Sequence, residues 1–140
     1  MVDRDKLAAK TASIRDAVAR VREVLPADVE QFETDRTIRE VVVLNLFVAI
    51  QDAVDLATHW TADEGWPLPE TYRQAFFQLA ERGVLDRAVA SAMADAAAFR
   101  NLVAHRYGDL DWVEVHRIAA GELGALEAFC QALAEATTGR

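Results

Sequence analysis

Three side chains capable of proton transfer and phosphate chemistry lie close together near the C-terminal third of the chain. The segment reads Arg100-Asn101-Leu102-Val103-Ala104-His105-Arg106-Tyr107. A histidine titrates near neutral pH and can donate or accept a proton during a reaction. An arginine offers a planar fork of N–H donors to a phosphate and stabilises charge that accumulates on it. This combination predicts a site for phosphate chemistry, with Arg100 and His105 as the reactive pair.

The spacing of these residues limits how they can meet. On an ideal helix His105 points about 140° away from Arg100. The two side chains can therefore reach one substrate only near a frayed helix end or across two subunits. Gly108 follows closely and is a typical helix terminator.

A row of small residues accompanies the arginine on the same predicted helix face. Small side chains let a second helix approach closely, so the row predicts a helix pair across a subunit interface. Its members are Met93, Ala97, Arg100, Ala104 and Tyr107.

A second polar row lies on a helix that is otherwise mostly apolar. Its four residues fall within about 80° of one another on an ideal helix. They are Asn45, Asp52, Asp55 and His59. Buried polar groups need partners, so these residues could orient Arg100 and His105. They could equally be the solvent-exposed edge of the helix, and the pattern leaves both interpretations open.

The elements that must position these residues are all predicted to be helices, because Pro and Gly are scarce and no long stretch alternates apolar and polar residues. We expect a single domain, residues 1–140, folded as an all-α, up-and-down bundle of four or five helices. Expected helices span about residues 3–25, 35–60, 69–83, 86–108 and from Asp111 onward, with a short piece ending near Phe32 and a loop at 61–69. Asp35 and Asp111 are the predicted N-caps.

Two apolar rows predict the core of the later helices. One is Leu85, Val89, Ala92, Ala96, Phe99 and Val103. The other lies on a single last helix and comprises Trp112, Val115, Ala119, Leu123, Leu126, Cys130 and Leu133.

Composition narrows the class of protein. The net charge of −8 argues against a broad, non-specific grip on a phosphate backbone, so any RNA contact must be local. One cysteine, Cys130, can form neither an internal disulfide nor a zinc cage, which fits a reducing cytoplasmic location. The first ten residues do not have the pattern of a signal peptide. The longest apolar run, residues 41–50, is about half of what a bilayer requires, so we expect no membrane segment.

The motif residues also carry a resemblance. Arg100, His105 and Tyr107 stand as Arg-x-x-x-x-His-x-Tyr with the polar Asn101 after the arginine, which resembles the ribonuclease signature of the HEPN superfamily in its HepT-like branch. The likeness extends to residues 35–57, 69–83 and 99–111.

This resemblance implies a homodimer whose two motifs share a cleft and cut RNA as an endoribonuclease toxin, without a metal or other cofactor. It implies catalytic roles for Arg100 and His105 and supporting roles for Asn101 and Tyr107. From the polar row, Asp52 and Asp55 are the candidate supports for the arginine and histidine, since buried arginines need carboxylate or carbonyl partners. The implied partner is a minimal nucleotidyltransferase antitoxin, which in some members attaches AMP to the motif tyrosine, here Tyr107.

An alternative is a non-catalytic helical adaptor that helps a nucleotidyltransferase to present its substrate. The acidity of the chain favours this second hypothesis, whereas the intact motif favours the enzyme.

Overall fold

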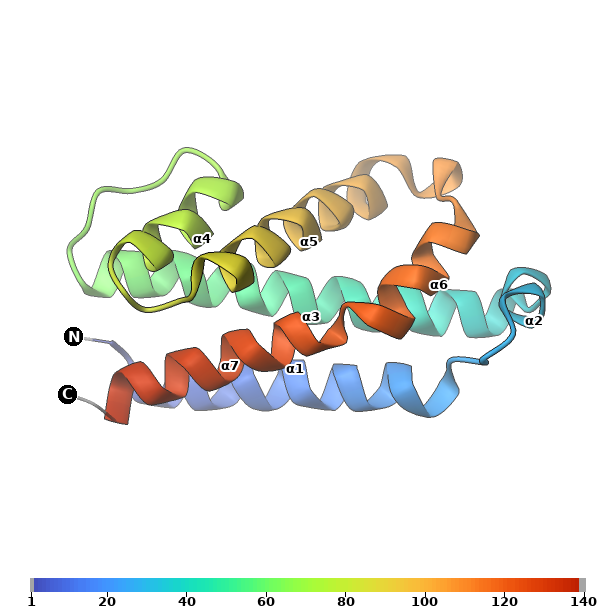
Figure 1. Cartoon of the computed structure of the whole chain (residues 1–140), viewed down its shortest axis with the longest axis horizontal. Coiled ribbons are helices and arrows are strands. Elements are labelled where there is room, and N and C mark those ends of the chain that lie inside the picture. Colours follow the sequence, from blue (N-terminus) through green and yellow to red (C-terminus); the bar gives the residue numbers. More distant parts are fainter. Residues whose placement is uncertain (1, 139–140) are drawn as a thin grey trace.

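The computed structural model describes residues 2–138, and within this range every regular element is helical (Figure 1). The α-helices are α1 (Arg4–Val24), α2 (Val29–Thr34), α3 (Arg36–Asp63), α4 (Tyr72–Glu81), α5 (Arg87–Arg106), α6 (Trp112–Gly121) and α7 (Leu123–Thr138). A 3-10 turn, η1 (Tyr107–Asp109), joins α5 to the segment before α6. The predicted all-α bundle is confirmed.

Helix α3 is the centre of the bundle. It packs against all six other α-helices, and α1 and α5 run antiparallel to α3 and α7 (Figure 1). Its side chains are buried around most of the circumference, including Val42, Leu46, Ala53 and Trp60. A helix covered on so many sides holds the positions of the others.

The same helix is long and apolar enough to cross a membrane, judged by length and composition alone. An 18-residue window of α3 has this apolar character, so the apolar stretch is longer than the predicted run 41–50. Within the bundle, however, 56% of that window is buried, because α3 is the core helix.

Aspartate caps fix the starts of the helices. The Asp35 carboxylate accepts from the Ile38 backbone N–H at 3.1 Å. Asp111 accepts from Val113 N–H at 3.0 Å, so both predicted N-caps are confirmed. Each such cap satisfies a backbone donor that the first helical turn would otherwise leave free.

Two predicted boundaries around the 61–69 loop are wrong. Helix α3 continues through Asp63, since Thr61 is fully buried and its hydroxyl donates to the Ala57 carbonyl at 3.0 Å. Helix α4 begins at Tyr72 rather than Pro69, because Thr71 is the residue that caps it, accepting from Gln74 N–H at 3.1 Å.

The predicted last helix is divided in two. Helix α6 ends at its C-cap, Glu122, and the axes of α6 and α7 run in different directions (Figure 1). Gly121 and Gly124 flank this point, and glycine is a poor helix former. Of the seven residues predicted on the inner face, Trp112 is half-buried and the other six are buried, namely Val115, Ala119, Leu123, Leu126, Cys130 and Leu133.

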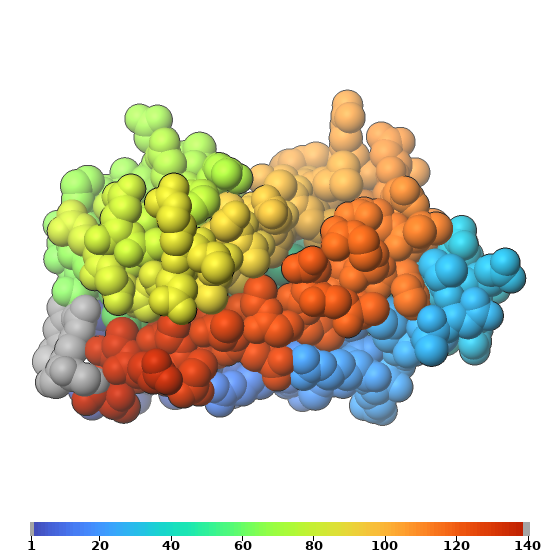
Figure 2. Space-filling model, viewed as in Figure 1, coloured from blue at the N-terminus to red at the C-terminus, as the bar shows by residue number. Residues whose placement is uncertain are grey.

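Helix α5 is rotated relative to its predicted core row. Met93 and Ala97, predicted at a subunit interface, are 0% and 3% exposed within one subunit. The small residues do permit close helix approach, but the helices that approach are α3 and α4 of the same chain. Ala92 and Ala96 are only half-buried and line an apolar groove of about 440 Å³ that opens between α5 and α6–α7 (Figure 2).

This placement yields a stability prediction for Ala97. Ala97→Leu adds volume to a filled core, and overpacking costs about 1–3 kcal/mol of unfolding free energy. Ala88→Leu, on the exposed face of the same helix, is the matched control and should change stability by less than about 0.5 kcal/mol. Urea unfolding measures both. Equal midpoints for the two variants would contradict the placement of Ala97.

Candidate functional site

The guanidinium of Arg100 is held from several directions. Its Nε donates to Gln51 Oε1 on α3 at 2.7 Å, and its Nη1 donates to Asn101 Oδ1 at 2.9 Å. Its Cζ lies 5.1 Å from the centre of the Phe47 ring and 5.9 Å from that of Tyr72. These bonds use two of the five N–H donors, so three remain for a ligand such as phosphate.

Gln51 is the first member of a polar chain that crosses α3. Its Nε2 donates to Asp55 Oδ1 at 2.9 Å. Lys10 of α1 contacts Asp55 Oδ2 at 3.2 Å and Asp52 Oδ1 at 3.3 Å. The hydrogen bond to Asp55 is the main reason that the pKa of Lys10 is raised, so the ammonium stays charged. The chain connects α1 to Arg100.

The four residues of the predicted polar row on α3 have different hydrogen-bond partners. Asp55 does not contact Arg100 directly, but Gln51 accepts from Arg100 and donates to Asp55 and so links the two. Asp52 faces α1, where it accepts from Ser13 Oγ at 2.5 Å. Asn45 donates to the Val41 carbonyl, and His59 lies 3.0 Å from Lys6 Nζ, so neither contacts the motif.

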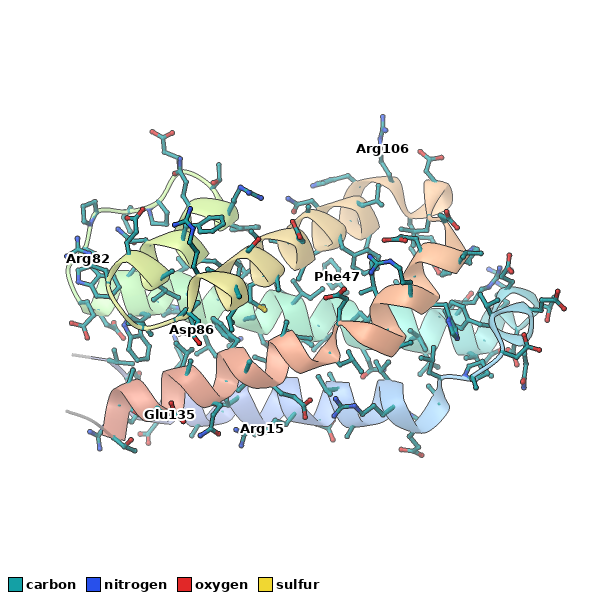
Figure 3. All side chains as sticks on the ribbon, viewed as in Figure 1. Arg15, Phe47, Arg82, Asp86, Arg106 and Glu135 are labelled. Carbon is teal, nitrogen blue, oxygen red and sulfur yellow. The ribbon has the colours of Figure 1, made fainter. Side chains whose placement is uncertain are left out.

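His105 is not brought to Arg100 within one subunit. Helix α5 remains regular through Arg106, and the backbone leaves helical geometry there, at φ −140°. The helix end therefore does not fray before His105, which is exposed and has no hydrogen-bond partner among residues 2–138. Arg106 projects outward beside it, away from the bundle (Figure 3). The predicted arrangement at a frayed helix end is therefore not present in this chain.

Tyr107 begins the 3-10 turn and its side chain is 44% exposed. Its ring meets Trp112 edge-on, with centroids 6.0 Å apart. The same Trp112 ring also contacts Arg39, whose Cζ lies 4.7 Å from the ring centre, and Phe32, whose ring centre is 6.1 Å away. Tyr107 also borders a shallow hollow with Leu44 and Phe47 of α3. The tyrosine is thus both supported and accessible.

Four residues that position Arg100 were absent from the sequence-based site: Gln51, Lys10, Phe47 and Tyr72. The spacing offered one signal, because Gln51 lies four residues before Asp55 and so stands beside it on a helix. Among the described residues no group of three or more His, Cys, Asp or Glu side chains could hold a metal ion.

Comparison with known proteins decides the family. The model of the ribonuclease HepT-like family matches residues 14–133. This chain belongs to the HepT-like family. The predicted family, and with it the ribonuclease class, is confirmed.

Individual HepT-like relatives agree with this assignment. The mRNA nuclease HepT of Shewanella oneidensis is 26% identical over 120 residues, which covers 86% of this chain and 90% of that protein.

Solved structures share the fold. A tri-AMPylated HEPN toxin of Shewanella oneidensis in complex with its MNT antitoxin has a TM-score of 0.86 at 24% identity, covering 94% of this chain and 98% of that one. YutE of Bacillus subtilis, a cytosolic protein of unknown function, has a TM-score of 0.84 at 16% identity, covering 96% and 90%.

The contact with Gln51 leads to a prediction about positioning. Gln51→Leu removes the acceptor for Arg100 Nε and frees Asp55. Losing a hydrogen bond to a charged group costs about 1.5–3 kcal/mol, so RNA cleavage should fall roughly tenfold to hundredfold.

Gln131→Leu, on the exposed side of α7, is the control and should cleave like the parent protein. Circular dichroism checks that both variants keep their helices. Full cleavage by folded Gln51→Leu would show that Arg100 does not depend on this contact.

Proposed function

We propose that this chain is a single-domain, metal-independent endoribonuclease toxin that is neutralised by a nucleotidyltransferase antitoxin. The observation that carries the proposal is the held guanidinium of Arg100, with three N–H donors left over, in a chain of the HepT-like family. An arginine fixed in this way can stabilise a phosphoryl transition state without reorganising during the reaction.

The active unit is a homodimer with one cleft. Arg100 and His105 point to different sides of α5, so a second copy must supply the histidine that one subunit cannot place. The face beside the motif supports this arrangement, because Leu44 of α3, which borders the same hollow as Tyr107, is 62% exposed, and Val48, one turn further along α3, is 38% exposed. Apolar side chains gathered in this way are typical of a surface that another protein covers.

The chemistry then follows from the residue types. The ribose 2′-oxygen attacks the adjacent phosphorus and loses its proton to a base, and the bond to the 5′-oxygen breaks as that oxygen gains a proton. The products are a 2′,3′-cyclic phosphate and a free 5′-hydroxyl. The His105 side chains of the dimer transfer the protons, and Arg100 stabilises the pentacoordinate phosphate.

Regulation acts through Tyr107. The related HEPN toxin is AMPylated and bound to an MNT antitoxin, which supports an equivalent partner for this chain. An AMP group on the exposed Tyr107 adds bulk and negative charge two residues from His105, so it would obstruct the cleft and repel RNA. We place the reaction in the cytoplasm, where RNA and the antitoxin are available.

Substitution of the motif tests catalysis. His105→Ala and Arg100→Ala should each lower RNA cleavage by about a hundredfold to ten-thousandfold, because each removes a proton-transfer group or a transition-state charge partner. His59→Ala, an exposed histidine away from the motif, is the control. Both motif variants should also relieve growth arrest when expressed without the antitoxin.

Metal dependence is measured on the same substrate. Cleavage by the parent protein should persist in EDTA. If EDTA abolishes it, the metal-independent mechanism is wrong, and if unmodified protein cleaves no cellular RNA, the adaptor hypothesis is favoured over the enzyme.

The chain's two tyrosines provide a matched test of modification. Expression with the adjacent nucleotidyltransferase gene should raise the intact mass by one or more AMP units. Tyr107→Phe should abolish this increase, whereas Tyr72→Phe should keep it. An increase that survives Tyr107→Phe would place the modification elsewhere.

A further inference from the structure

A pocket of about 580 Å³ opens immediately beside the held arginine. It is formed where the loop before α4 brings the start of α4 next to the second half of α5 (Figure 1). Its walls come from Thr58, Leu68, Pro69, Glu70, Thr71, Tyr72, Ala75 and Asn101. Two of these residues, Tyr72 and Asn101, also contact the Arg100 guanidinium, so the pocket and the arginine are parts of one surface.

We propose that this pocket binds a nucleobase of the RNA next to the scissile phosphate, and that it prefers a base with an exocyclic amino group. The inference rests on the proposed ribonuclease function. It adds a substrate subsite that would make the cleavage selective, with Arg100 holding the phosphate and the pocket holding the flat base beside it.

The walls suit a base more than an anion. Tyr72 is 37% exposed and Leu68 is 74% exposed, so an aromatic and an aliphatic surface are open to solvent. Unpaired bases of RNA are commonly bound by stacking on such side chains. The Glu70 carboxylate would repel a phosphate placed in the same space.

Several backbone donors around the start of α4 already have partners. Gln74 N–H is taken by Thr71 Oγ1, and Ala75 N–H is taken by the Thr71 carbonyl. The Glu70 N–H donates to Gln74 Oε1 at 2.8 Å. With the Glu70 carboxylate beside it, this helix end is a poorer partner for a phosphate than the charged guanidinium of Arg100.

Two polar groups are left to read the edge of a base. Asn101 Oδ1 faces Arg100, so its Nδ2 is turned away and has no acceptor within residues 2–138. The Glu70 carboxylate takes part in none of the ion pairs between residues 2 and 138. A carboxylate accepts hydrogen bonds and cannot donate them. Adenine, cytosine and guanine each offer an exocyclic amino donor, whereas the one edge donor of uracil, N3–H, lies between two carbonyl oxygens that would repel the carboxylate, so the first three bases are favoured.

The overall charge makes such a subsite useful. With a net charge of −8 the chain draws little binding energy from non-specific attraction to the RNA backbone. Stacking and hydrogen bonding to one base do not require a basic surface, so they can bind RNA to an acidic protein at a chosen position.

Cleavage sites on a pool of RNAs of random sequence test the proposal. With the parent protein, uracil should be under-represented at one fixed nucleotide position next to the cleaved bond. Glu70→Gln should weaken that preference by about three- to tenfold, the size of one hydrogen bond. Leu68→Trp should fill the pocket and reduce the preference further. Glu81→Gln, an exposed acid of α4 outside the pocket, is the control.

A binding arm separates this proposal from the ribonuclease function itself. A short 2′-deoxy oligonucleotide has no 2′-oxygen to attack the phosphorus, so the protein can bind it but cannot cleave it. Removing the base at the preferred position should weaken this binding. If no cleavage occurs and the preferred position is unknown, each base is removed in turn. Fluorescence anisotropy measures this difference, which should disappear in Leu68→Trp. If the parent protein binds the oligonucleotide with this dependence on the base but never cleaves RNA, the ribonuclease proposal is wrong and the pocket proposal stands. Identical binding or cut-site preferences in parent and pocket variants overturn the pocket.

Discussion

Burial of α3 is the constraint on which the rest of the structure depends. A helix covered by six others can leave few polar groups without partners, since an unpaired buried charge is costly. Asp52 and Asp55 are therefore paired with Lys10, and Asp55 in turn holds Gln51. The polar chain that satisfies the core helix is the same one that orients Arg100. Stability of the bundle and positioning of the site are thus coupled through a few contacts.

The two motif residues have opposite environments on one helix. Arg100 is half-buried and fixed by α3, α4 and its neighbour Asn101, which suits a group that must stabilise charge at a defined place. His105 is exposed and remains in regular helix, which suits a group that completes the site only when a second subunit approaches. The proposed homodimer would bring these two groups together, and the proposed modification of the exposed Tyr107 would lie two residues from His105.

Much of the architecture was predictable because it depends on local interactions. The caps at Asp35 and Asp111 and the inner row of α6 and α7 follow from contacts within a few residues. The face of α5 was harder, because alanine-rich rows lie on several sides of that helix. Met93 and Ala97 suit a subunit interface as well as a core, and the choice depended on where α3 and α4 pack.

The sequence by itself determined the helical class, the family and the motif, since these rest on residue types and on spacing along one chain. It also made Asp55 a candidate support, through its place on an apolar helix. Only the tertiary structure decided that Gln51 is the direct partner of Arg100, that Phe47 and Tyr72 flank the guanidinium, and that Asp52 turns to α1. These contacts join residues far apart in the chain, and their partners are chosen by the rotation and depth at which the helices pack, which no local pattern records.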